Sequence, residues 1–181
     1  LDPPEDEDPH AFAAYGGALA IALRRFKFSD RPDLARPLGH LLRAAARSSA
    51  LEADLVVPVP LHPRRLAERG YNQAALLASA VATELNAPHG ARALVRVKNT
   101  SQQAKLERFA RLANVEDAFR VRDPKAVRGR YIVLVDDVAS TGSTLAACKT
   151  TLLAAGAADV TGLVVARAEL IGSGNSVESL M

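Results

Sequence analysis

The hydrophobic positions of the chain follow two different spacings after residue 50. Four short apolar runs rich in β-branched residues have the composition of buried strands, and they cover 55–59, 94–97, 131–135 and 160–166. Two longer stretches, 73–85 and 143–155, repeat apolar residues at helical spacing. Strands that alternate with helices are typical of a mainly parallel sheet covered on both faces, so the pattern predicts an α/β fold.

The first fifty residues show helical spacing instead. Apolar residues recur over 12–26 and again over 34–47, with a break at 29–32 between the two predicted helices. The acidic stretch before Pro9 is typical of a solvated end. We therefore expect an N-terminal acidic leader and helical segment (1–50), a sheet domain (51–170) and a flexible tail (171–181).

The composition is that of an ordinary globular protein. With 49% hydrophobic and 24% charged residues, the 181-residue chain is too apolar for disorder and long enough to bury one core. No apolar stretch approaches the length of a membrane span, and the N-terminus is acidic where a signal peptide would be basic. These features predict a cytoplasmic protein without a membrane span.

Cys148 is the only cysteine of the sequence, which excludes an internal disulfide and a cysteine-cluster zinc site. It is either a reactive thiol or buried filler, and the apolar helical pattern around it favours the second. The net charge of +3 comes from local arginine clusters, and aromatic residues make up 4% of the chain. Basic and aromatic residues do not interleave, which argues against a platform that stacks single-stranded bases. The nearly balanced charge argues mildly against direct DNA contact.

The segment IVLVDDVASTGST (132–144) carries the most specific chemistry of the sequence. In an open parallel sheet, ligands bind beyond the carboxyl ends of the strands, where this segment runs into a helix. Gly142 permits a tight turn, and the free backbone N–H groups of the helix start favour an anion. The segment lacks the lysine of a P-loop and therefore predicts a monophosphate site. The residues expected to form this site are Ala139, Ser140, Thr141, Gly142, Ser143 and Thr144.

Two adjacent acids, Asp136 and Asp137, precede this phosphate site. Their carboxylates repel each other, which costs free energy unless a ligand uses them. Two vicinal ribose hydroxyls would donate to them, and Mg²⁺ shared with a pyrophosphate would relieve the repulsion. The alternative is a solvated turn that caps the next helix, but the hydroxyl-rich loop favours the ligand site. Both carboxylates are then expected to face the cleft rather than the core.

The same segment resembles the phosphoribosyl pyrophosphate (PRPP) motif of type I phosphoribosyltransferases. Two further stretches are similar to the ComF/GntX family of competence proteins, namely YGGALAIALRRFKFSDRPDLARPLGHLL (15–42) and DLVVPVPLHPRRLAERGYNQA (54–74). The likeness covers most of the chain. It implies a type I phosphoribosyltransferase-like fold, whose PRPP module is related to that of the amidophosphoribosyltransferases.

The resemblance assigns the loop after the first sheet-domain strand to pyrophosphate. Arg64 and Arg65 have fork-shaped donors that suit phosphate oxygens, although a solvated basic turn is the alternative. His62 is either a general base or a turn histidine. In the related enzymes, a loop at the position of 98–114 closes over PRPP. The residues implicated in pyrophosphate binding or in the closed state are Val59, Pro60, Leu61, Arg64, Arg65, Arg96, Lys98, Thr100, Gln103, Arg111 and Asn114.

The reaction implied is displacement of pyrophosphate from the anomeric carbon of PRPP by a nucleobase-like or amine acceptor. Asp136 and Asp137 would hold the ribose, while Mg²⁺, Arg64 and Arg65 would neutralise the leaving group. No residue marks itself as the base that activates the acceptor, and the acceptor is unidentified.

Two other functions stay open beside this enzyme. The chain is alternatively a PRPP- or nucleotide-sensing regulator, or an accessory protein of DNA uptake that acts through competence partners, as the ComF resemblance implies. The stretch 24–28 is expected to bury Phe26 and to place its basic residues on a solvated face or a partner surface. A homodimer is a further open alternative. Longer ComF proteins carry an N-terminal zinc segment built on paired cysteines, and no such ligand set is expected here.

Overall fold

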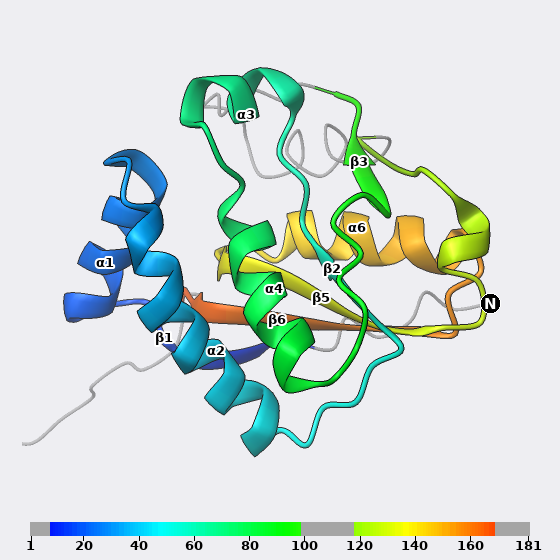
Figure 1. The fold of residues 1–181 in the computed structure, drawn as a ribbon, viewed down its shortest axis with the longest axis horizontal. Helices are drawn as coiled ribbons and strands as arrows, with labels where there is room; N and C mark the ends of the chain where they lie inside the picture. The colour runs from blue at the N-terminus through cyan, green and yellow to red at the C-terminus, as the bar shows by residue number, and fades with distance from the viewer. Residues whose placement is uncertain (1–7, 99–117, 169–181) are drawn as a thin grey trace, which may run out of the picture.

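The protein folds around a four-stranded parallel sheet with the strand order β1-β6-β5-β2 (Figure 1). The computed structural model describes residues 8–98 and 118–168. The strands of the main sheet are β1 (His10–Ala14), β2 (Leu55–Pro58), β5 (Tyr131–Ala139) and β6 (Asp159–Arg167). A separate antiparallel pair contains β3 (Leu94–Arg96) and β4 (Phe119–Val121).

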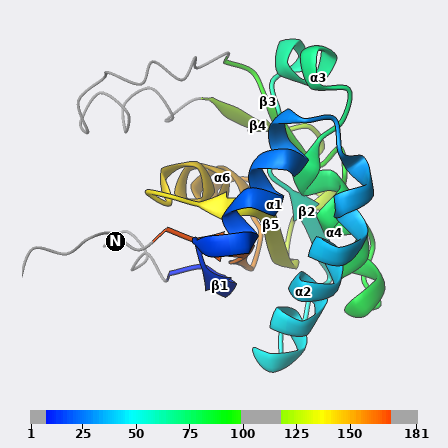
Figure 2. The ribbon, with the colours of Figure 1, turned by 90° about the vertical axis from the view of Figure 1, so that its left-hand side faces the viewer.

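Helices cover both faces of the main sheet. Figure 2 shows α6 (Ser143–Ala154) on one face, and α2 (Ala35–Ser48) and α4 (Gln73–Glu84) on the other. Two more helices, α1 (Gly17–Phe28) and the short α3 (Pro63–Arg69), complete the set that concerns the site. Short 3-10 turns lie at Pro32–Leu34 and Pro124–Ala126. Across the described residues, no helix has the length and apolar character that crossing a bilayer requires.

The strand β5 shows how the sheet builds two cores. Successive side chains of a strand point to opposite faces. Ile132 and Leu134 therefore pack with residues of α6, while Val133 and Val135 pack with residues of α2 and α4. The continuous apolar run in the sequence is that of a strand buried on both faces. The predicted α/β fold with a parallel sheet between helices is confirmed.

The predicted helix over 12–26 is wrong at its beginning. Residues 10–14 form the edge strand β1, in which Ala11 lies opposite Val164 of β6. The helix begins only at Gly17. The helical spacing of Phe12 is a coincidence. Residues 10–14 form a strand because the edge of β6 offers them hydrogen-bond partners, which no local sequence pattern reveals.

The run at 94–97 forms a strand, but not in the main sheet. In β3, Arg96 lies opposite Phe119 of the antiparallel partner β4. The strand type was predicted correctly and its position wrongly, since a three-residue partner strand gives almost no periodic signal.

The helix α3 is the element that the hydrophobic pattern missed. It has seven residues and none of them is buried, so it has no apolar stripe. Its boundaries nevertheless follow local rules: Pro63 occupies the first turn and Gly70, with φ +81°, ends the helix in the left-handed region.

Candidate functional site

A cavity of about 220 Å³ lies at the carboxyl edge of the main sheet. Its wall combines the end of β5, the loop after β2 and residues of α1, α3 and the start of α4, and we call it the acid cavity. The strands β2 and β5 are neighbours, which brings their following loops together. Of the residues predicted from the sequence, the cavity unites Asp136, Asp137, Ser140, Thr144, Val59, Pro60, Leu61, Arg65 and Arg96.

Asp137 lines the acid cavity but is not open to solvent. Only 3% of its surface is exposed. Nζ of Lys27, at the end of α1, lies 3.0 Å from each of its carboxylate oxygens. The expectation that both acids face an open cleft therefore holds only in part. The reason is that β5 continues through the acids to Ala139, so that Asp137 points to the α1 side, where Lys27 covers it.

Asp136 is half-buried and points to the opposite side of β5, toward α6. Removal from solvent and the neighbouring Asp137 carboxylate raise the pKa of Asp136 to about 8, although Lys27 partly offsets the rise. The Asp137 N–H donates to Oδ1 of Asp136 at 2.8 Å. A cation or hydroxyl donors in the cavity would favour the ionised form of Asp136. The electrostatic cost of paired acids is thus present in the structure.

The hydroxyl-rich loop leads from β5 into α6. Gly142 has φ +74°, in the left-handed region that favours glycine, and it is the N-cap residue of α6. The Ser143 N–H donates to Thr141 Oγ1 at 3.4 Å. Glycine has no side chain to cap the next N–H groups of the first turn of α6, which suits an anion there. Thr141 Oγ1 and Ser143 Oγ lie 2.8 Å apart. All six residues predicted for the phosphate site line a hollow of about 60 Å³ that also includes Asp136.

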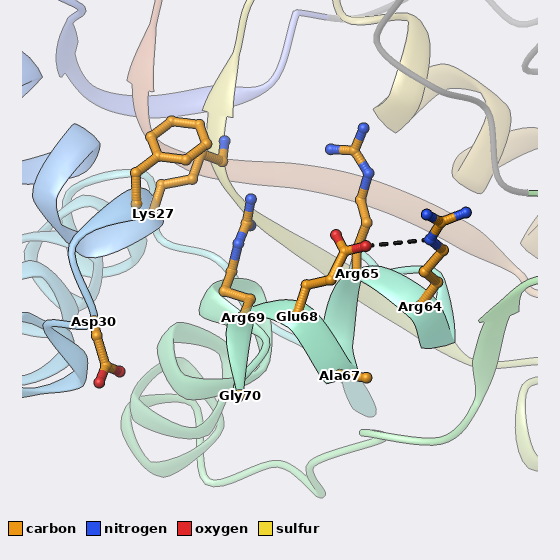
Figure 3. Close-up of a pocket in the computed structure, with 9 residues that line it drawn as sticks. Lys27, Asp30, Arg64, Arg65, Ala67, Glu68, Arg69 and Gly70 are labelled. Carbon is orange, nitrogen blue, oxygen red and sulfur yellow. Dashed lines mark hydrogen bonds and ion pairs between the residues drawn. The ribbon is translucent and has the colours of Figure 1, made fainter.

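The loop after β2 is held against β5 through its backbone. The Val59 N–H donates to the Val135 carbonyl at 2.9 Å. Arg65, on α3, lines the acid cavity, whereas Arg64 does not. Instead, Nε of Arg64 lies 3.2 Å from a carboxylate oxygen of Glu68 (Figure 3). The structure separates two arginines that the sequence presents as equivalent.

His62 caps the helix α3. Its Nδ1 accepts a hydrogen bond from the Arg64 N–H at 3.3 Å. It lines neither the acid cavity nor the adjoining hollow. This geometry favours the interpretation as a turn histidine over that as a general base.

Two cations of the acid cavity, Lys27 and Arg69, were not predicted as site residues. Lys27 belongs to the stretch 24–28, whose basic residues were expected on a solvated face or a partner surface. Phe26 of that stretch is buried as expected, and its carbonyl accepts from the Tyr71 hydroxyl and from Gln73 Nε2, which fixes the end of α1 over the site. Lys27 and Asp137, which form an ion pair, are 110 residues apart in the sequence, so no local sequence pattern could pair them.

The residues assigned to a closing loop are placed only in part. Arg96 lines the acid cavity, and its guanidinium carbon lies 5.4 Å from the centroid of the Phe119 ring. Burial lowers the pKa of Arg96. Lys98 is exposed and lines neither the acid cavity nor the hollow beside it. The other predicted residues lie outside the described part of the chain, namely Thr100, Gln103, Arg111 and Asn114.

Cys148 is buried in α6. Burial and the nearby Asp136 carboxylate raise the pKa of the Cys148 thiol well above its usual value. A buried thiol that stays protonated is a poor nucleophile, so the interpretation as buried filler is confirmed.

The donor set fits a magnesium ion that the protein would share with a ligand. Within 8–98 and 118–168, no group of three His, Cys, Asp or Glu side chains could hold a metal without other ligands. Mg²⁺ at phosphate sites takes one or two carboxylates and completes its shell with ligand oxygens and water. Oδ2 of Asp137 is buried and meets Lys27 Nζ in an ion pair without hydrogen-bond geometry, and Asp136 has a raised pKa. These two acids are the residues that would contact such an ion.

The sequence and this geometry match a known family. The phosphoribosyl transferase domain matches residues 72–174, more than half of the chain. The chain belongs to the phosphoribosyltransferase domain family. Its fold agrees, since the allosteric regulatory enzyme of purine biosynthesis superposes with a TM-score of 0.55, over 79% of this chain and 30% of that enzyme's chain. At 22% identity, that likeness shows the fold alone.

A second solved member of this fold is the glutamine PRPP amidotransferase from B. subtilis. It superposes with a TM-score of 0.54 and 23% identity, and the match covers 78% of this chain and 30% of the amidotransferase chain. Because the identity is again below a quarter, this match also concerns the fold alone.

The curated relatives of the chain confirm the ComF resemblance. DNA utilization protein YhgH of Escherichia coli K12 is 38% identical over 153 residues, which is 82% of this chain and 66% of the relative. Competence protein F of Haemophilus influenzae is 38% identical over 70% of this chain and 58% of its own length. Competence protein ComFC of Bacillus subtilis is 36% identical, over 72% of this chain and 52% of its own length. The chain thus spans less than two thirds of the length of these relatives.

Proposed function

We propose that the chain transfers the phosphoribosyl group of PRPP to a nucleobase-like or amine acceptor. One observation carries the proposal: the paired acids, the hydroxyl-rich start of α6 and the cation Arg65 meet at adjoining cavities. They offer hydrogen-bond acceptors for a ribose, donors for a monophosphate and positive charge for a pyrophosphate. PRPP carries these three groups on one sugar.

The 5-phosphate of PRPP would bind in the hollow at the start of α6. The left-handed Gly142 turns the chain so that the loop and the first turn of α6 surround that hollow. Backbone N–H donors and side-chain hydroxyls are neutral, so they suit a phosphate that remains bound throughout the reaction.

The ribose hydroxyls would donate to Asp136 and Asp137. Carboxylates accept hydrogen bonds and cannot donate when they are ionised, which matches two vicinal hydroxyls. Lys27 lies 3.0 Å from both carboxylate oxygens of Asp137 in the absence of a ligand. A bound sugar and a nearby cation would favour the ionised form of Asp136.

The transfer exchanges one bond for another at the anomeric carbon. The carbon–oxygen bond breaks, its electron pair leaves with pyrophosphate, the acceptor nitrogen bonds to the carbon, and the acceptor loses a proton. Positive charge develops on the sugar near the two acids, and negative charge on the leaving group near Arg65. Asp136 and Asp137 would hold a Mg²⁺ ion, which would supply further neutralisation of pyrophosphate.

A second candidate is a protein that binds PRPP as a signal and acts in DNA utilization or uptake through protein partners. The names of the relatives favour it, since two are competence proteins and one is a DNA utilization protein. Both candidates use the same PRPP site, so they differ in turnover rather than in binding.

Release of pyrophosphate distinguishes the candidates. The protein is incubated with PRPP, Mg²⁺ and a panel of bases and amines, and release is compared with that of Arg65→Ala; calorimetry measures PRPP binding in parallel. Acceptor-dependent release above that of the variant supports the transferase. PRPP binding without such release, for every acceptor, moves the assignment to the PRPP-sensing protein. Failure to bind PRPP would contradict both candidates.

A further inference from the structure

A second cavity, of about 880 Å³, adjoins the acid cavity (Figure 3). It lies between the end of α1 and the helix α3, and we call it the cationic cavity. Lys27, Phe28, Arg65 and Arg69 line both cavities. A molecule in the cationic cavity would therefore lie directly beside the site proposed for PRPP.

Two cations of the cationic cavity already have acidic partners. Arg64 forms an ion pair with Glu68 at 3.2 Å. Lys27 forms an ion pair with Asp137 at 3.0 Å. Neither cation needs a ligand for charge compensation. A third, Arg65, is the residue that the proposed reaction assigns to pyrophosphate.

Arg69 is the cation without such a role. It is half-buried, and its guanidinium donates to the neutral Oε1 of Gln73 at 2.8 Å. In the described residues it forms no ion pair, and Figure 3 shows the Asp30 carboxylate directed away from it. Burial lowers the pKa of Arg69 because it holds this charge away from water, and the Asp137 carboxylate offsets only part of that effect. A ligand with negative charge would offset the remainder of this effect.

Phe28 adds a flat apolar surface to the same wall. It is the most exposed of the large hydrophobic residues in the described structure, at 69%. The guanidinium carbon of Arg69 lies 5.5 Å from the centroid of its ring. Aromatic rings pair with one another by offset stacking or edge contacts, so a planar ligand would cover Phe28 and lie next to Arg69.

We propose that the cationic cavity is the acceptor site and that its acceptor is a planar nitrogen-containing ring bearing a carboxylate. The ring would pack on Phe28, and the carboxylate would receive the paired donors of Arg69. A single available guanidinium matches the single charge of a carboxylate better than the double charge of a phosphate. The inference rests on the proposed transfer reaction, in which a ring nitrogen bonds to the anomeric carbon and pyrophosphate departs with the electron pair of the broken carbon–oxygen bond. A ring nitrogen that carries a proton loses it, and a pyridine-type nitrogen becomes a cation.

The test uses pairs of rings that differ at one acidic substituent. Orotate and uracil, nicotinate and nicotinamide, and imidazole-4-carboxylate and imidazole are each titrated calorimetrically into the protein without PRPP, so that the result does not depend on turnover. Binding of PRPP with Mg²⁺ is measured separately on the same preparation. We expect the acidic member of at least one pair to bind about 10-fold more tightly or better, the effect of one charge-assisted hydrogen bond.

Matched variants assign the preference to Arg69 and Phe28. Arg69→Gln should remove the preference for the acidic ring and bind both members of the pair similarly. Phe28→Ala should weaken both members together. The controls lie on α1 but line neither cavity: Arg25→Gln, another arginine, and Ile21→Ala, another exposed apolar residue, should bind as the wild type does.

The outcomes separate this inference from the proposed function. Equal or absent binding of both members in all three pairs overturns the acidic acceptor, even where PRPP binds. An acidic preference that survives in Arg69→Gln also overturns it. If the preference is present and depends on Arg69 while PRPP does not bind, the acidic-ring site stands and the transferase assignment fails.

Discussion

The acid cavity has two halves that are built in different ways. One half is a continuous segment, 136–144, which provides both acids and the loop at the start of α6. The other half is assembled from Lys27 on α1 and from Arg65 and Arg69 on α3. The first half consists of backbone groups and acids fixed by a strand. The second consists of long side chains on helices at the edge of the fold.

This difference concerns energy as well as construction. In the continuous half, burial and then the neighbouring acid oppose the ionised form of Asp136, so a ligand gains by relieving an existing repulsion. In the assembled half, Lys27 and Arg69 already contact protein groups, and a ligand would exchange one partner for another. Loss of the continuous half should therefore reduce PRPP binding more than loss of any single cation.

The largest effect is expected from Asp136→Asn combined with Asp137→Asn. The variant loses two charged acceptors for the ribose hydroxyls, and each hydrogen bond to a charged group contributes about 1.5–3 kcal/mol. PRPP affinity in the presence of Mg²⁺ should fall at least about 100-fold, as measured by calorimetry. Circular dichroism should show a folded protein, because both side chains lie at the cavity and not within either apolar core. An unchanged affinity in the folded variant would remove the acids from the site.

A smaller effect should come from Arg65 and almost none from its neighbour. Arg65→Gln removes a charge-assisted contact to pyrophosphate, and PRPP affinity should fall roughly 10- to 100-fold. Arg64→Gln removes a cation paired with Glu68 outside the acid cavity, so its affinity should stay within about 3-fold of the wild type. Parallel titrations at one salt concentration provide the measurement. Equal losses in the two variants would mean that the arginines act as one cluster, as their sequence suggests.

The continuous half was predictable from the sequence because its chemistry is local. An apolar run predicted β5, and the adjacent acids and glycine then placed a phosphate site at the start of α6. What the sequence did not show was that β5 continues through the acids, which sends Asp136 and Asp137 to opposite sides. Pairing with β6 extends the strand, and that pairing is a property of the fold.

The assembled half was not predictable in the same way. Lys27 reaches Asp137 only because Tyr71 and Gln73 hold the carbonyl of Phe26 at the end of α1. Each of these contacts joins residues more than forty positions apart, beyond the range of any periodic pattern. The edge strand β1 was missed for the same reason, since its partner β6 comes near the end of the described chain.

The raised pKa of Asp136 gives a prediction for stability. The ordinary aspartate value is 3.8 and the folded value is about 8, so the folded state holds the proton more tightly and stability falls as the pH rises through this window. Asp136→Asn has no proton to lose and should escape the fall. Above pH 8 its free energy of unfolding should exceed that of the wild type by on the order of 2 kcal/mol, because water at the half-buried carboxyl screens part of the penalty.

Urea unfolding at several pH values between 4 and 9 measures this difference. The matched control is Asp30→Asn, an exposed acid without an ion pair among the described residues, which should follow the wild type. A gap between Asp136→Asn and the wild type that stays constant with pH would show that the Asp136 carboxyl is not held in the protonated form by the fold.

The smallest effect separates backbone strain from ligand binding. Gly142 and Gly129 have φ values of +74° and +70°, and a Cβ added at either would meet no atom within 4 Å. Alanine at each position should therefore lower stability by a similar amount, about 1–2 kcal/mol, through the left-handed backbone alone. Only Gly142 belongs to the loop of the continuous half, so only Gly142→Ala should also weaken PRPP binding, by roughly 3- to 10-fold, as the backbone N–H groups shift away from the phosphate. Urea unfolding and calorimetry on both variants provide the comparison. If Gly129→Ala weakens PRPP binding as much as Gly142→Ala does, the effect would follow from lower stability, and the N-terminus of α6 would not be the phosphate site.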